Sequence, residues 1–133
     1  MSEKWKKLPK IYVWLLIFDW GSKLIARSVG WYQVNSGVGM GLLNGLPNLV
    51  IVVSFLILAW LLFSAQSVAL KLILVGGVAN FADRLINGQV TDWILLPVVK
   101  LWLNPADIFI TLGVLMYLFG EFKIKQDENS DHI

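Results

Sequence analysis

Two aspartates, Asp92 and Asp107, flank one loop of a chain that is otherwise mostly apolar. Two carboxylates held close together share one proton, because double ionisation of like charges is unfavourable. Such a pair can hydrolyse a peptide bond, since the ionised member takes a proton from water while the protonated member donates to the scissile carbonyl. This chemistry needs no metal, no cofactor and no covalent intermediate. The two residue types and their placement therefore predict a catalytic pair.

The surroundings of Asp107 suggest how the proton is shared. Asn104 and Pro105 precede it and read as the N-cap and first position of a helix, which places Asp107 in the first turn. A helix N-terminus favours negative charge, so we hypothesise that Asp107 is the ionised member and Asp92 holds the proton. Each residue also has a simpler interpretation, Asp107 as a structural residue of the helix start and Asp92 as a solvated loop carboxylate.

Two further polar groups accompany the pair. One face of a predicted helix carries three polar residues at spacings of three and four: Asn80, Asp83 and Arg84. We expect them to lie at the same outer boundary of the membrane as the aspartate pair. Asp83 and Arg84 are also interpretable as a structural ion pair. Asp19 and Lys23 lie four residues apart on another helix, where they can neutralise each other while the lysine snorkels to the membrane interface.

Composition limits the kinds of protein this can be. Of the 133 residues, 57% are hydrophobic and 15% charged, whereas soluble domains carry about 25% charged residues. This composition indicates a membrane protein. The absence of cysteine excludes disulfides, thiol catalysis and a lipid-modified cysteine. The single histidine, His132, lies in a polar tail, which argues against a Ser-His dyad and a histidine zinc site within the membrane. No basic patch is interleaved with aromatics, so nucleic acid is not an expected partner.

The elements that must position these residues are apolar runs of membrane-spanning length. We predict an all-α membrane protein of one domain, with a small extracytoplasmic loop region. The four expected transmembrane helices cover approximately residues 9–28, 48–64, 68–86 and 104–122, followed by a polar cytoplasmic tail, 123–133, disordered from Gln126. The lysines of residues 1–10 place both termini in the cytoplasm, with an uncleaved first helix. Trp31, Trp93 and Trp102 are expected at the outer interface.

Four short blocks occur in order along the chain. They are Asp19-Trp-Gly-Ser-Lys23, the glycine-rich run from Asn35 to Leu43, the stretch from Gly77 to Ile94, and Asn104-Pro-Ala-Asp107. In these blocks the chain resembles the lipoprotein signal peptidase (signal peptidase II) family. The resemblance implies that Asp92 and Asp107 are the catalytic dyad. It implies substrate-binding or supporting roles for Asp19, Lys23, Asn35, Asn80, Asp83, Arg84 and Asn104.

The resemblance also implies a function. The expected enzyme is an aspartyl endopeptidase of the bacterial inner membrane, with its active site at the outer face. It would remove the signal peptide from diacylglyceryl-modified prolipoproteins, just before the lipidated cysteine. Membrane lipid, prolipoprotein substrates and globomycin-like inhibitors are its implied partners, and no metal or cofactor is implied.

The chain departs from the family pattern at several positions. Trp20 stands where glutamine is usual, Ala79 replaces a glycine, and Met40 replaces an aromatic residue. The connection from Asp19 to Asn35 is short, so the substrate-holding sheet of the family is expected to be trimmed, which bears on substrate range. Two alternatives stay open: a catalytically inactive relative that binds lipidated peptides, and a small proton-coupled exporter that uses Asp19.

Overall fold

The computed structural model describes residues 10–37, 45–65 and 67–130. Within these ranges the chain forms four helices and two small antiparallel sheets. The helices are α1 (Lys10–Val29), α2 (Pro47–Ser64), α3 (Val68–Asn87) and α4 (Pro105–Ser130). The strands are β1 (Gln33–Asn35), β2 (Val90–Asp92), β3 (Ile94–Leu96) and β4 (Leu101–Leu103).

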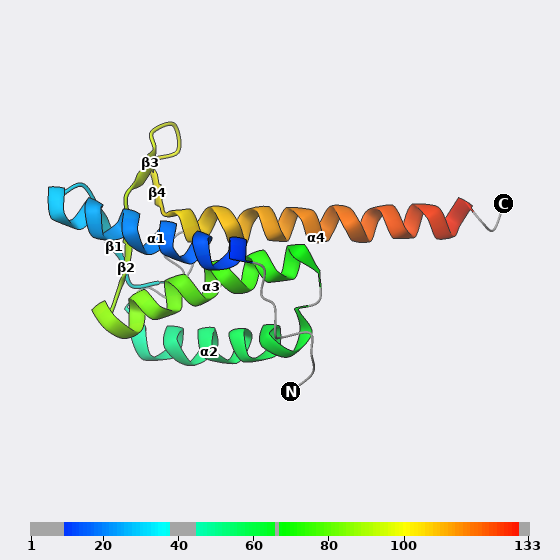
Figure 1. The fold of residues 1–133 in the computed structure, drawn as a ribbon, viewed down its shortest axis with the longest axis horizontal. Coiled ribbons are helices and arrows are strands. Elements are labelled where there is room, and N and C mark those ends of the chain that lie inside the picture. Colours follow the sequence, from blue (N-terminus) through cyan, green and yellow to red (C-terminus); the bar gives the residue numbers. More distant parts are fainter. Residues whose placement is uncertain (1–9, 38–44, 66, 131–133) are drawn as a thin grey trace.

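The helix α3 is the centre of the bundle. It packs against each of α1, α2 and α4, and the four helices run roughly alongside one another (Figure 1). Ser67 caps its start, where the side-chain hydroxyl accepts a hydrogen bond from the Leu70 N–H at 3.2 Å. Gly88 ends it with a φ of 74°, a left-handed conformation that glycine adopts without steric penalty.

Two glycines let α3 and α4 approach closely. A Cβ atom on Gly76 would lie 2.5 Å from the Ala106 carbonyl oxygen, and one on Gly113 would lie 2.6 Å from the Ala69 carbonyl oxygen. Small residues at such contacts are typical of helix packing in membranes. The close contact brings the C-terminal half of α3 beside the first turn of α4, where the predicted site residues Asn80 and Asp107 lie.

The two sheets lie at the end of the bundle where α1 and α3 end and α4 begins (Figure 1). β1 pairs with β2 so that Gln33 faces Asp92, and β3 pairs with β4 so that Ile94 faces Leu103. Only Trp93 separates β2 from β3, and its N–H donates to the Leu103 carbonyl at 3.0 Å. β2 therefore fixes Asp92 against the strand that leads into α4.

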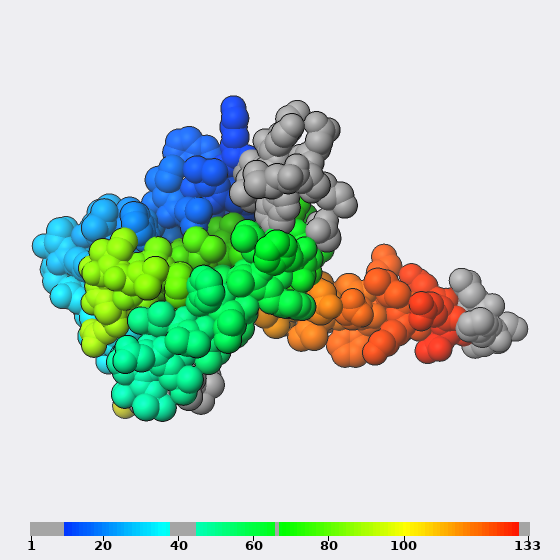
Figure 2. Space-filling view, turned by 90° about the horizontal axis from the view of Figure 1, so that it is seen from below, coloured from blue at the N-terminus to red at the C-terminus, as the bar shows by residue number. Residues whose placement is uncertain are grey.

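The observed helices agree with the predicted helical segments. Seven of the eight predicted ends lie within one residue of an observed helix end, and the exception is the end of α4. The expected disorder from Gln126 is wrong up to Ser130, because α4 continues through these residues as an exposed helix beyond the rest of the bundle (Figures 1 and 2). Three residues of this extension, Lys125, Gln126 and Glu128, have good helix propensity, which favours a continued helix where tertiary packing is absent.

One helix among the described residues, α2, is long and apolar enough to cross a membrane by length and composition, with a mean hydropathy of 2.2. Other predictions concern residues 1–9, 38–44 and 131–133, including the N-terminal lysines, Met40 and His132, and these lie outside the described part of the chain.

Candidate active site

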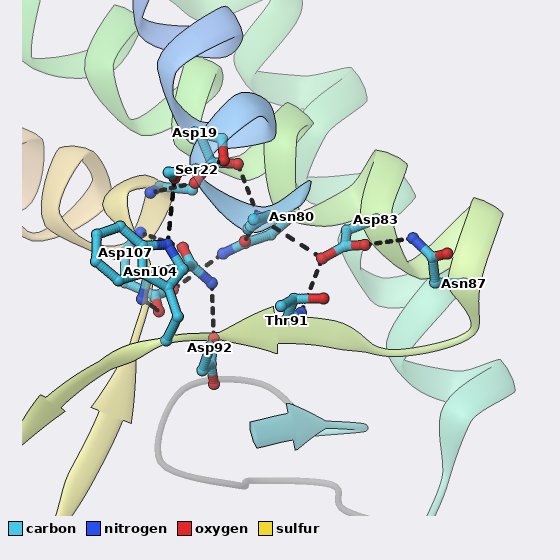
Figure 3. Close-up of polar contacts among 12 residues, drawn as sticks. Asp19, Ser22, Asn80, Asp83, Asn87, Thr91, Asp92, Asn104 and Asp107 are labelled. Carbon is cyan, nitrogen blue, oxygen red and sulfur yellow. Dashed lines mark hydrogen bonds and ion pairs between the residues drawn. The ribbon is translucent and has the colours of Figure 1, made fainter. Parts of the chain in front are cut away.

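Asn104 joins the two predicted catalytic aspartates. Its side-chain Nδ2 donates to Asp92 Oδ1 at 2.7 Å, and its Oδ1 accepts from the Asp107 N–H at 3.0 Å (Figure 3). Its own backbone N–H donates to Asp107 Oδ2 at 3.0 Å. This reciprocal pattern is a capping box built with Asp in place of Glu, so the start of α4 and the aspartate pair depend on the same residue.

Asn80 connects Asp107 to a buried ion pair. Its Nδ2 donates to Asp107 Oδ1 at 2.9 Å, and its Oδ1 accepts from Lys23 Nζ at 3.0 Å. Lys23 in turn lies 2.7 Å from Asp19, whose other oxygen accepts the Ala106 N–H of α4 at 2.8 Å. The predicted Asp19–Lys23 pair is thus confirmed. The alternative of a snorkelling lysine is wrong, since Lys23 is only 3% exposed and its ammonium points into the site.

Asp83 lies in a second set of contacts, which Lys23 joins to the first, since its Nζ is 3.8 Å from Asp83 Oδ2. Asp83 accepts from Asn87 at 2.6 Å and from the Thr91 N–H at 2.8 Å (Figure 3). It also accepts from Arg27 Nη2 at 2.7 Å. The interpretation of Asp83 and Arg84 as an ion pair is wrong, because adjacent helical residues point in different directions. Arg84 Nη2 instead donates to the Gly37 carbonyl at 2.6 Å, and its buried Nε has no partner among the described residues.

Arg27 and Thr91 were not predicted as site residues. Arg27 donates to the Thr91 hydroxyl as well as to Asp83, and so ties α1 to the strand that carries Asp92. Arg27 lies four residues after Lys23 and eight after Asp19, on the same helical face as that pair. This spacing could have indicated from the sequence that Arg27 belongs to the site. Nothing in the local sequence marks Thr91.

A cavity of about 460 Å³ opens beside the two aspartates. Its polar lining comes from the sheets, from α2, from the C-terminal half of α3 and from the first two turns of α4, and consists of Asn35, Ser54, Asn80, Arg84, Asp92, Asp107 and Thr111. Its apolar lining includes deeper turns of α2 and α3 and the strand β4. Cavities of this size and mixed character are typical of ligand sites. Five of the nine predicted site residues therefore meet at one cavity, and the other four, Asp19, Lys23, Asp83 and Asn104, do not line it.

The environment of Asp92 favours its protonated form. Burial, and secondarily the neighbouring charge of Asp107, raise the pKa of Asp92 to about 7, against opposing effects of Asn104, Lys23 and Asn35. Within residues 10–37, 45–65 and 67–130, no three acidic, histidine or cysteine side chains are grouped to hold a metal ion. The arrangement can therefore perform acid–base chemistry with two carboxylates, one of them protonated near neutral pH.

Known proteins resemble this chain over most of its length. The family model for signal peptidase (SPase) II matches residues 11–123. The chain belongs to the signal peptidase II family. The match contains every predicted site residue, from Asp19 to Asp107.

Individual signal peptidase II relatives cover most of the chain. The lipoprotein signal peptidase of Pseudomonas paraeruginosa (strain DSM 24068 / PA7) is 29% identical over 136 residues, spanning 94% of this chain and 75% of its own. That of Caldicellulosiruptor bescii is 35% identical over 95 residues, spanning 66% of this chain and 63% of its own. A solved bacterial membrane enzyme shares the fold, with a TM-score of 0.79, 24% identity and coverage of 88% of both chains.

Proposed function

We propose that this signal peptidase II family member removes the signal peptide from diacylglyceryl-modified prolipoproteins, with Asp92 and Asp107 as its catalytic pair. The observation that carries the catalytic assignment is the bridge through Asn104, which bonds to both carboxylates beside the cavity. The alternative of an exporter coupled through Asp19 has less support, because Asp19 is 0% exposed and bonded to Lys23 and Ala106. The alternative of an inactive relative lacks its expected mark, the loss of one acid.

In the proposed reaction Asp107 is the base and Asp92 the acid. Asp107 takes a proton from water, whose oxygen bonds to the scissile carbonyl carbon, while Asp92 gives its proton to the carbonyl oxygen. The tetrahedral intermediate then loses the C–N bond. The leaving nitrogen takes the proton from Asp107, and one hydroxyl of the intermediate returns a proton to Asp92. Two hydrogen bonds donated to Asp107, from Asn80 and from the Asn104 N–H, support its role as the ionised partner.

The residues around the cavity fit a peptide attached to lipid. The apolar walls from α2 and α3 suit a signal peptide or an acyl chain, and the polar end brings Asn35, Asn80 and Arg84 beside the aspartates. The buried Arg84 Nε is a donor suited to a substrate backbone carbonyl. We assign these three residues to substrate positioning, and expect globomycin-like inhibitors to occupy the same cavity.

We further propose that all four helices cross the bacterial inner membrane, with both termini in the cytoplasm and the aspartates near the outer face. Large hydrophobic side chains are exposed along each helix, among them Trp14 on α1, Phe55 on α2, Val78 on α3 and Leu118 on α4. A contiguous apolar exterior of this kind is compatible with lipid and unfavourable in water. Among the charged residues of α1 and α3, Asp19, Lys23 and Asp83 are instead buried between the elements of the protein, and Arg84 lines the cavity. Intramembrane charges generally face the protein interior in this way.

The substrate assignment is tested by cleavage in vitro. Purified protein is incubated with a diacylglyceryl-modified prolipoprotein and with the same precursor lacking the lipid, and product masses are measured. We expect cleavage of the lipidated precursor alone, immediately before the modified cysteine, and inhibition by globomycin. Cleavage of both precursors at equal rates, or at another bond, would contradict the proposed substrate class.

A further inference from the structure

The hairpin formed by β3 and β4 lacks the polar face that such an element needs in water. From Trp93 to Leu103 it contains one charged residue, Lys100, and the strands Ile94–Leu96 and Leu101–Leu103 have no polar side chain. Antiparallel strands with one wet face alternate apolar and polar residues, and a lone two-stranded hairpin is marginal in water. Both faces of this hairpin therefore require apolar surroundings.

The protein supplies those surroundings for only part of the hairpin. Leu101, Trp102 and Leu103 line the cavity. The tip is left uncovered, with Val98 95% exposed and Val99 66% exposed. The hairpin projects sideways from the helices, across their axes, at the level where α4 begins (Figure 1). Its tip consequently points away from the cavity and from the four helices.

If the helices cross a bilayer, the direction in which the hairpin projects determines how deep in the bilayer the hairpin lies. A segment that projects sideways at the outer end of α4 lies in the plane of the membrane surface. Its unpaired strand edges carry backbone groups that the hydrocarbon interior cannot satisfy, which restricts it to the interfacial region. Lys100 suits lipid phosphates, and the tilted pair of Trp31 and Trp102, with ring centroids 5.6 Å apart, is typical of that region.

We propose that the tip of this hairpin, Pro97 to Lys100, is a lipid-binding element that seats Val98 and Val99 at the headgroup–acyl boundary of the outer leaflet. The proposal rests on the membrane placement proposed above. β4 runs directly into Asn104, the residue that bridges the aspartates. Anchoring the tip in lipid thus holds one wall of the cavity, and the start of α4, at a fixed depth relative to the lipid-attached substrate.

Quenching by spin-labelled lipids tests this directly, because the chain contains no native cysteine. Single cysteines at Val98, at Leu56 on the exposed face of α2, and at Asp127 on the exposed end of α4 are each coupled to an NBD fluorophore. The proteins are reconstituted into phosphatidylcholine–phosphatidylglycerol vesicles containing lipids with a nitroxide at carbon 5 or carbon 12. Leu56 reports insertion of the bundle, and Asp127 reports a position in water.

We expect the Val98 probe to be quenched at least twofold more by the carbon-5 than by the carbon-12 nitroxide, the Leu56 probe to be quenched strongly, and the Asp127 probe by neither. A Val98 probe that behaves like the Asp127 probe, beside a quenched Leu56 probe, overturns the hairpin proposal and leaves the membrane placement standing. An unquenched Leu56 probe overturns both. A Val98 signal that changes with the protein-to-lipid ratio identifies a second copy of the chain as the occupant, which also overturns the proposal.

Discussion

At the residue scale, Asn104 has two roles that substitution can separate. Its Oδ1 caps α4, and its Nδ2 holds Asp92. Serine preserves a cap but is too short to reach Asp92, whereas alanine removes both contacts, and the loss of an N-cap costs about 1 kcal/mol. We expect Asn104→Ser to keep the wild-type thermal midpoint and to lose about 10²-fold in cleavage rate. Asn104→Ala should lose activity and stability together.

Thermal unfolding and cleavage kinetics of both variants measure this separation. Asn87→Ala is a matched control, because Asn87 donates to Asp83 outside the cavity. An Asn104→Ser variant with unchanged kinetics would show that the contact to Asp92 is dispensable.

The raised pKa of Asp92 gives a second prediction at this scale. Burial and the charge of Asp107 bring that pKa to about 7, from an ordinary value of about 4. The folded state thus binds this proton more tightly than the unfolded state. The resulting stabilisation is complete below pH about 4 and is lost as the pH rises through about 7. Cleavage should decline above pH about 7 for the same reason, since the acid loses its proton.

In the Asp92→Asn variant the side chain at this position cannot ionise. The variant should therefore not lose stability as the pH rises through about 7. We expect its thermal midpoint, relative to wild type, to rise between pH 5 and pH 8, although the variant loses most of its cleavage rate. Asp127→Asn, an exposed carboxylate on the end of α4, serves as the control. Parallel pH dependences for Asp92→Asn and wild type would show that Asp92 is already ionised at pH 5 in the folded protein.

At the element scale, the contact between α3 and α4 positions Asn80 beside Asp107. Alanine at Gly76 would place a methyl group 2.5 Å from a backbone oxygen at the start of α4, so the helices must separate. We expect Gly76→Ala to lower thermal stability by about 1–3 kcal/mol and to lower cleavage at least tenfold. Gly120→Ala in α4 meets nothing within 4 Å and should be neutral or stabilising. Equal behaviour of the two variants would contradict the role of close packing.

The strand β2 depends on the clamp that Arg27 forms with Asp83 and Thr91. Hydrogen bonds to charged groups contribute about 1.5–3 kcal/mol each, and Arg27 donates both to Thr91, the residue next to Asp92, and to Asp83 on α3. We expect Arg27→Met to reduce kcat more than it raises KM, because the carboxylate is displaced while the substrate cavity is kept. Steady-state kinetics distinguish the two effects. A change confined to KM would assign Arg27 to substrate binding instead.

Elements were easier to predict from the sequence than their contacts. Long apolar runs ended by Gly88, or begun by Asn104 and Pro105, indicate helices because backbone and solvent constraints act locally. The pairing of Asp83 with Arg27 could not be read in the same way, since the two residues lie 56 positions apart. Their contact depends on which faces α1 and α3 present to each other, and that is set by tertiary packing.

At the scale of the whole molecule, α3 is the helix against which the other elements of the site pack. It contributes Asn80 and Arg84 to the cavity, and it supports α4 and α2 on either side. The family blocks predicted which residues belong to the site, but not that Lys23 reaches Asp107 through Asn80. The sequence suggested that the lysine reaches water, because its long side chain commonly does so. The surrounding carboxylates, Asp19 and Asp83, instead hold its ammonium inside the bundle.

The central claim is that Asp92 and Asp107 act together as the catalytic pair. It is tested most directly by cleavage of a lipidated prolipoprotein by wild type, Asp92→Asn and Asp107→Asn, with Asp127→Asn as the control. We expect both dyad variants to remain folded, to bind globomycin, and to lose at least about 10²–10⁴-fold in rate, while the control cleaves normally. A folded variant of either aspartate that cleaves at the wild-type rate would contradict the account.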